Sequence, residues 1–176
     1  MNLLLESEER PVIWRGPLIT SAIRQFWEDA DWGELDELLV DLPPGTSDAA
    51  LTVMQNLPIG GIIMVTTPQA LSTMVVNKAV MMARTLNAPM IGIIENMAGF
   101  VAGDTGHRYE IFGPSHANEV AQLAGAPLLA RLPIRPELAA VCDSGMIEQA
   151  VMPEMDAVVA RVAGISPREA VRRPSI

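Results

Sequence analysis

The residues of this chain that most clearly suggest chemistry lie in segment 38–46, Leu-Leu-Val-Asp-Leu-Pro-Pro-Gly-Thr. An apolar run ending in an acidic residue is typical of a buried parallel strand that presents a carboxylate, here Asp41, at its C-terminal edge. At nucleotide-hydrolysis sites such an Asp helps to hold the Mg²⁺ that accompanies the β- and γ-phosphates. Pro43, Pro44 and Gly45 then predict a stiff turn that can bring a backbone N–H close to a phosphate.

A strand that simply ends before a helix cap would also show an apolar run followed by Asp. The continuation Asp-Leu-Pro-Pro-Gly-Thr favours the nucleotide interpretation. Yet neither G-x-x-x-x-G-K-[ST] nor G-K-G-G-x-G-K-[ST] occurs anywhere in the sequence. The acidic half of a nucleotide site is therefore present without the phosphate-binding loop.

Composition narrows the class of protein. A length of 176 residues fits one compact domain, and 49% hydrophobic residues with only 4% aromatics predict an aliphatic core. No apolar run approaches the roughly 20 residues that span a bilayer, and the N-terminus lacks signal-peptide features, so we expect a cytoplasmic protein. The net charge of −9 disfavours nucleic acid and anionic membranes as partners. The single cysteine, Cys142, excludes an internal disulfide.

The chain alternates between predicted strands and helices. Expected strands are Leu38–Asp41, Ile62–Thr66, Met90–Glu95 and Leu128–Leu132. Expected helices begin at Pro17 and at Ser47, a candidate N-cap, and span Pro68–Leu86, Pro114–Ala124, Pro136–Cys142 and Pro153–Ala163. A polar loop is expected over 96–113, and residues 166–176 are expected to be a disordered tail. This alternation predicts an α/β fold with a doubly wound, mainly parallel sheet in residues 1–165.

Six motifs in order resemble the signatures of the Mrp/ApbC family. They are Trp14-Arg15-Gly16-Pro17, Asp31-Trp32-Gly33-Glu34-Leu35-Asp36, Asp41-Leu42-Pro43-Pro44-Gly45-Thr46, Thr66-Thr67-Pro68-Gln69, Gly92-Ile93-Ile94-Glu95-Asn96-Met97 and Tyr109-Glu110-Ile111-Phe112-Gly113. These proteins are deviant-Walker P-loop ATPases that deliver iron–sulfur clusters, and they are related to MinD and the nitrogenase iron protein. The resemblance covers residues 1 to about 150.

The resemblance implies roles for particular residues. Asp41 would assist Mg²⁺ without binding it directly, and Pro43, Pro44 and Gly45 would sense the γ-phosphate of Mg·ATP. Asn96 would recognise adenine through its amide. Pro133 would line the other side of the base, although a proline that merely ends a strand is an equal alternative.

Family members begin with a further segment that includes the phosphate loop, so the resemblance implies an N-terminally truncated chain. In the family the phosphate-loop strand lies between the strand of Asp41 and the strand Ile62–Thr66. Without it, we expect these two strands either to pair directly or to leave a gap in the sheet.

The family's bridging [4Fe–4S] cluster is held by a Cys-x-x-Cys pair from each subunit of a dimer. The matching positions here are Ala102 and Thr105, and neither side chain offers the thiolate that such clusters need. The nearby His107 is expected to be solvated, and Cys142 to behave as a small apolar residue within a helix. The cluster is therefore expected for the family but not for this chain.

The resemblance implies ATP-dependent iron–sulfur cluster carriage, with recipient apoproteins as partners and a homodimer or a dimer with a full-length family member as the assembly. One alternative is a non-catalytic interaction module that docks on full-length members. Another is a MinD/ParA-like positioning ATPase, which the Trp-Arg-Gly-Pro motif and the lack of a basic amphipathic C-terminal helix disfavour.

We predict that this chain alone binds Mg·ATP weakly and does not hydrolyse it. Losing three charge-assisted hydrogen bonds from a phosphate loop, at about 1.5 kcal/mol or more each, weakens binding by roughly 4 kcal/mol. That is on the order of a thousandfold in affinity. Calorimetric titration of this chain, and of a version extended to include a phosphate loop, measures the difference. Micromolar affinity or phosphate release from the short chain would contradict the prediction.

Overall fold

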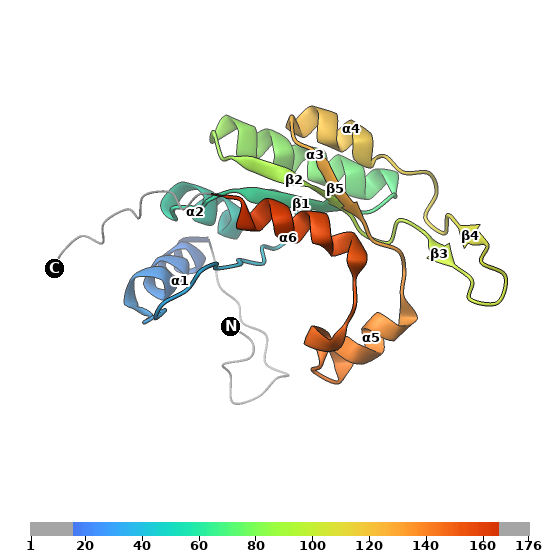
Figure 1. Ribbon diagram of the computed structural model, residues 1–176. Coiled ribbons are helices and arrows are strands. Elements are labelled where there is room, and N and C mark those ends of the chain that lie inside the picture. Colours follow the sequence, from blue (N-terminus) through green and yellow to red (C-terminus); the bar gives the residue numbers. More distant parts are fainter. Residues whose placement is uncertain (1–15, 166–176) are drawn as a thin grey trace. The chain divides into compact units, whose positions relative to one another are not determined.

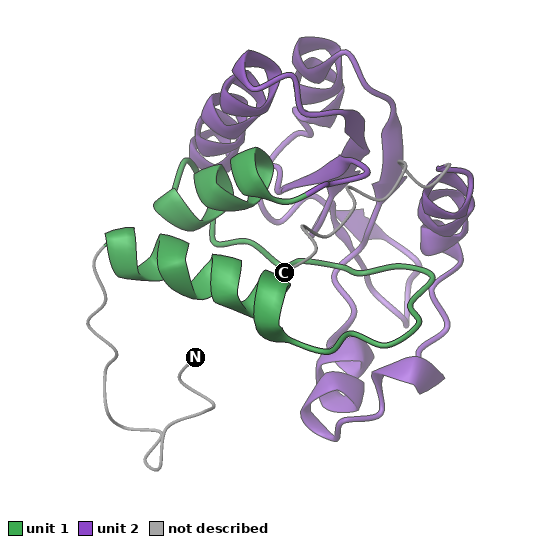
Figure 2. Ribbon diagram, turned by 90° about the vertical axis from the view of Figure 1, so that its left-hand side faces the viewer, with its two compact units in different colours: residues 1–57 green, residues 58–176 purple. Residues whose placement is uncertain are grey.

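The computed structural model describes residues 16–165. The chain divides into two compact units, 1–57 and 58–176 (Figure 2). The expected disordered tail, 166–176, lies outside the described residues.

The N-terminal unit contains helices α1 (Gly16–Asp29) and α2 (Asp48–Asn56). Ser47 is the N-cap of α2, as predicted, because its hydroxyl accepts a hydrogen bond from the Ala50 N–H at 3.2 Å. The two helices contact each other, and the hydroxyl oxygens of Thr20 and Thr52 lie 3.0 Å apart. Both helices therefore begin close to their predicted positions.

The expected strand Leu38–Asp41 is wrong. These residues have no regular structure, and the Leu39 side chain is 81% exposed. An extended segment becomes a strand only when a neighbour accepts and donates its ladder hydrogen bonds, and no strand among residues 16–165 does so for this segment. The apolar run predicts β propensity only, and among the described residues the segment has no partner strand with which to form a ladder.

The C-terminal unit is built on a three-stranded parallel sheet in the order β1–β2–β5 (Figure 1). The strands are β1 (Ile62–Thr66), β2 (Met90–Glu95) and β5 (Leu128–Arg131). Helices α3 (Ala70–Thr85) and α4 (Ala117–Ala124) cover one face, and α6 (Asp156–Ala163) covers the other (Figure 1). The α/β class and the parallel, doubly wound arrangement are thus confirmed.

The strand β1 forms one edge of this sheet. Its second edge is not paired with any strand among residues 16–165. The direct pairing considered from the sequence therefore does not occur. An open edge leaves N–H and C=O groups available to another strand.

The two faces of the sheet bury different apolar groups. On the α6 side, Ile94, Ala130 and Val158 form a core cluster. Partly buried residues packed around it are Ile63, Leu129, Leu132, Met155 and Val162. Successive strand residues point to opposite faces, so the fully buried Ile93 points to the side of α3 and α4. Burial on both faces explains why these strands read as continuous apolar runs.

The remaining helices and strands of this unit lie in the segments that follow β2 and β5. The expected loop 96–113 contains a short antiparallel pair, β3 (Phe100–Val101) and β4 (Arg108–Tyr109). After β5 come α5 (Pro136–Asp143) and the short 3₁₀ helices η2 (Ile147–Gln149) and η3 (Pro153–Met155). Cys142 is exposed on α5, so its expected apolar environment is wrong. Every helix among the described residues is too short or too polar to cross a bilayer.

We predict that Gly92→Ala destabilises the chain by about 1–3 kcal/mol, the usual cost of overpacking a core. A Cβ at Gly92 would lie 2.4 Å from Leu129 Cγ and 2.9 Å from the backbone oxygen of Pro127. Gly103→Ala is the matched control, because a Cβ there meets no atom within 4 Å. Urea denaturation of both variants measures the difference. Equal midpoints for the two variants would contradict the packing described for β2 and β5.

Candidate functional site

The three parallel strands end in one row of paired residues. Thr66 pairs with Glu95, and Glu95 pairs with Arg131. In open α/β sheets, ligands bind outside the carboxyl ends of the strands. The loops that leave this row are therefore the place to look for a binding site.

Asn96 is the first residue beyond the end of β2. Its N–H donates to the Thr66 carbonyl at 2.8 Å, which holds the backbone against the end of β1. Its side-chain oxygen accepts a hydrogen bond from the Met97 N–H at 2.9 Å. Met97 has a φ of 56°, a left-handed conformation that a non-glycine residue adopts at a free-energy cost. Backbone strain of this kind is concentrated at functional sites.

Pro133 lies in the segment that leaves β5, directly beside the segment that contains Asn96. The Ala98 N–H donates to the Leu132 carbonyl at 2.9 Å, and the Ile134 N–H donates to the Gly99 carbonyl at 2.7 Å. The two segments thus continue side by side beyond the sheet. Asn96 and Pro133, chosen from the sequence as opposite sides of a base site, come from adjacent strands at one edge.

Glu95 is a residue to which the sequence analysis assigned no role. Its side chain is 0% exposed, and Arg131 Nε lies 3.3 Å from its Oε2. Neither carboxylate oxygen accepts a hydrogen bond from any described group. A buried charge directly before Asn96 is unusual, since carboxylates are rarely buried without full pairing. The feature of the sequence that could have indicated a buried Glu95 is its position as the last residue of the apolar run Met90–Glu95.

Asp41 and the turn after it lie in the N-terminal unit, whereas Asn96 and Pro133 lie in the C-terminal unit. Asp41, Pro43 and Pro44 are exposed. Gly45 has a φ of 78°, so the Pro-Pro-Gly turn requires glycine at its last position. The predicted turn is therefore present, and its role toward a phosphate stays a prediction.

The described residues contain no group of three His, Cys, Asp or Glu side chains that could hold a metal ion. Mg²⁺ in nucleotide sites keeps several waters and is bound through one or two carboxylates together with the phosphates. A single carboxylate such as Asp41 does not form a Mg²⁺ site by itself. It could only assist a Mg²⁺ ion that is already bound to the phosphates of a nucleotide.

The positions that match the family's cluster cysteines lie in the turn between β3 and β4. The Gly106 N–H donates to the Ala102 carbonyl at 2.8 Å, and the Thr105 hydroxyl accepts from the His107 N–H at 3.3 Å. Ala102 and Thr105 thus lie in one closed turn. Neither has a thiol, and the ring of His107 contacts Tyr109 edge-on.

Comparisons with known proteins give a consistent picture. The family model of the ParA group described as the NUBPL iron-transfer P-loop NTPase matches residues 1–164. The iron–sulfur cluster carrier protein of Clostridium perfringens is 44% identical over 151 residues, which cover 86% of this chain and 53% of that protein. The iron–sulfur cluster carrier protein of Methanocaldococcus jannaschii is 47% identical over 147 residues, covering 83% and 51%.

A solved structure is also similar. It is the nucleotide-binding protein of Archaeoglobus fulgidus in complex with ADP, with a TM-score of 0.70 and 41% identity. The match covers 79% of this chain and 57% of that chain. This chain spans about half the length of the curated relatives it matches.

We predict that anaerobic reconstitution with iron and sulfide leaves no stable cluster on the unmodified chain, because the turn between β3 and β4 lacks thiolates. The double variant Ala102→Cys/Thr105→Cys should gain bound iron and sulfide. Ala139→Cys is the matched control, since it places a thiol three residues before Cys142 on α5. Iron and sulfide are assayed after desalting. Retention by the unmodified chain, or equal retention by the control, would contradict the prediction.

Proposed function

Because this chain belongs to the family of NUBPL-type iron-transfer P-loop NTPases, we propose that it serves iron–sulfur cluster carriage as an adenine-nucleotide-binding protein. One observation supports the proposal most strongly. At the carboxyl edge of a parallel sheet, β2 and β5 continue into two adjacent segments, and one contains Asn96 while the other contains Pro133.

These two side chains suit a purine. A primary amide has both a donor and an acceptor, and adenine presents the complementary pair, its 6-amino group and an adjacent ring nitrogen. To reach the base, the Asn96 amide oxygen would leave its present donor, the Met97 N–H. Pro133 offers an apolar ring without a backbone N–H, which suits contact with the face of the base.

The N-terminal unit would respond to the phosphates. A glycine turn presents backbone N–H groups, and such turns bind anions. We assign the γ-phosphate to Pro43, Pro44 and Gly45, and assistance of the accompanying Mg²⁺ to Asp41.

The iron–sulfur cluster is cargo in this proposal. Because the turn of Ala102 and Thr105 has no thiolate, the thiolate ligands would come from a full-length family member in a mixed dimer. Recipient apoproteins then take the cluster from that dimer. ATP hydrolysis is likewise assigned to the assembly that has a phosphate loop.

A second candidate function, a non-catalytic module that docks on a full-length member, is favoured by the edge of β1, which pairs with no strand among residues 16–165. Open strand edges bind other strands through main-chain hydrogen bonds. The two proposals differ in one observable. Only the first requires a change at the Asn96 amide when an adenine nucleotide is added.

We predict that ADP at millimolar concentration shifts the side-chain amide signal of Asn96 in ¹H–¹⁵N spectra. Asn96→Ala should weaken ADP binding about tenfold, the worth of roughly 1.4 kcal/mol of hydrogen bonding. Asn118→Ala, on the exposed side of α4, is the matched control and should bind like the parent chain. Unchanged binding by Asn96→Ala would exclude this base site.

A further inference from the structure

The Glu95–Arg131 ion pair ties together the two strands that lead to Asn96 and Pro133. Glu95 is fully buried, while the Arg131 side chain is 41% exposed, and Nε and Oε2 are 3.3 Å apart. The carboxylate oxygens have no hydrogen bond from the described residues, so this single contact is what opposes the cost of burying the charge.

Such a pair is a poor source of stability. Removing the Glu95 carboxylate from water costs free energy that its attraction to Arg131 has to offset, and apolar replacements of such pairs are often neutral or stabilising. Removing Arg131 alone is costly, because the Glu95 charge then stays buried without a partner. Stability therefore does not explain the Glu95–Arg131 ion pair, and we look for another function of these two side chains.

The position of the pair suggests that function. Glu95 directly precedes Asn96, and Arg131 lies two residues before Pro133. The pairing of β2 with β5 is irregular between Ile93 and Ile94, immediately before the ion pair. Irregular pairing next to a site changes the direction of side chains. At the last row of this ladder, the ion pair is thus a side-chain link that fixes the spacing of the two strand ends.

The backbone beyond the ion pair is strained and firmly anchored. Met97 is left-handed, and the hydrogen bonds from Asn96 to Thr66 and from Ala98 to Leu132 hold the residues on either side of it. Strained conformations persist only where the surroundings over-determine them. If the ends of β2 and β5 shift relative to each other, the Ala98–Leu132 bond and the strained turn relax together, and the Asn96 amide is reoriented.

We infer that Glu95 and Arg131 are positioning residues that set the base selectivity of the site, by holding the Asn96 amide and the Pro133 ring at a fixed separation. The inference rests on the proposed adenine site. It predicts that loss of the pair reduces discrimination between adenine and guanine nucleotides, even when the chain remains folded.

The test compares ADP with GDP binding by NMR titration of the full chain. Glu95→Gln keeps the shape of the side chain and removes the buried charge, and because the remaining Arg131 is half-exposed, folding is less affected. Arg131→Gln removes the partner and leaves the Glu95 carboxylate buried, so its base ratio is compared on folded protein. Each should reduce the ADP-to-GDP affinity ratio by about tenfold, equal to the loss of one oriented hydrogen bond. Arg131→Lys, which keeps the charge, should recover part of the ratio.

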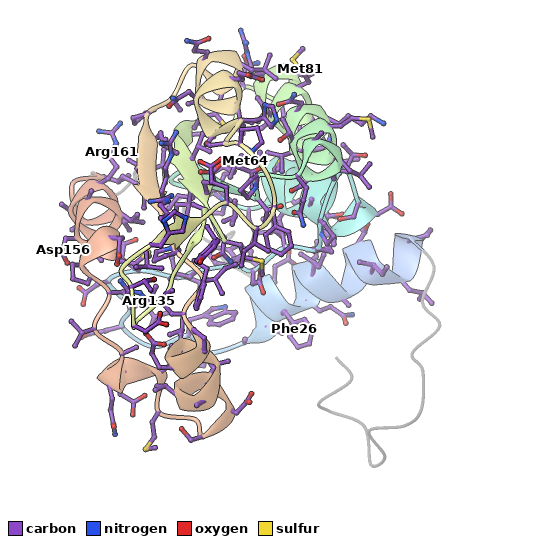
Figure 3. All side chains as sticks on the ribbon, turned by 90° about the vertical axis from the view of Figure 1, so that its right-hand side faces the viewer. Phe26, Met64, Met81, Arg135, Asp156 and Arg161 are labelled. Atoms are coloured by element: carbon purple, nitrogen blue, oxygen red, sulfur yellow. The ribbon has the colours of Figure 1, made fainter. Side chains whose placement is uncertain are left out.

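Glu154→Gln is the matched control. Arg135, labelled in Figure 3, donates to the Val151 carbonyl at 3.0 Å and to Glu154 Oε1 at 2.5 Å. Removing this second Arg–carboxylate pair of the same unit should lower the melting temperature and leave the base ratio unchanged. If Glu95 and Arg131 had a purely structural role, their variants would also have a lower melting temperature and an unchanged ADP-to-GDP affinity ratio.

Two results would overturn the inference, and they are distinguishable. If the parent chain shows no ADP-dependent shift at Asn96, the proposed base site and this inference both fail. If the parent chain binds and discriminates, while Glu95→Gln or a folded Arg131→Gln keeps the parent ratio, only the positioning role fails.

Discussion

The parallel pairing of β1, β2 and β5 is the constraint on which the rest of the C-terminal unit depends. Parallel strands end at the same edge of a sheet, so Thr66, Glu95 and Arg131 form one row and the loops after them share one edge. The apolar faces of the strands bury the sheet between α3 and α4 on one side and α6 on the other. This burial places a charged residue, Glu95, in the interior, and Arg131 compensates it. Polar groups that could bind a ligand thereby lie in loops that a rigid sheet positions.

Much of this architecture could be predicted from the sequence, for local reasons. Apolar runs of five or six residues bounded by Gly and Pro gave β1 and β2 their predicted limits, and Ser47 marked the start of α2. The segment Leu38–Asp41 has the same local signal but no strand beside it. The state of that segment depends on a partner, and no local pattern reveals whether a partner is present. Glu95 was missed for a related reason, since burial and pairing with Arg131 are properties of the assembled sheet.

The family and the placement of the candidate site residues could also be predicted from the sequence. The family inferred from six short motifs is confirmed by the match of the family model to residues 1–164. The placement of Asn96 and Pro133 on neighbouring strand ends follows from parallel topology, and the roles of these two residues stay predictions. The Pro-Pro-Gly turn belongs to one compact unit, and Asn96 and Pro133 belong to the other. The turn between β3 and β4 has the closed geometry of a ligand-bearing loop, yet Ala102 and Thr105 remove the thiolate chemistry.

The central claim is that adenine is bound between Asn96 and Pro133 at the carboxyl edge of the sheet. Intermolecular nuclear Overhauser effects between ADP and the ¹³C,¹⁵N-labelled chain test it most directly. The claim predicts cross-peaks from the adenine ring protons to the Pro133 ring protons and to the Asn96 side-chain amide. Cross-peaks from those ring protons only to residues away from this edge, with Pro133 and Asn96 unaffected, would contradict it.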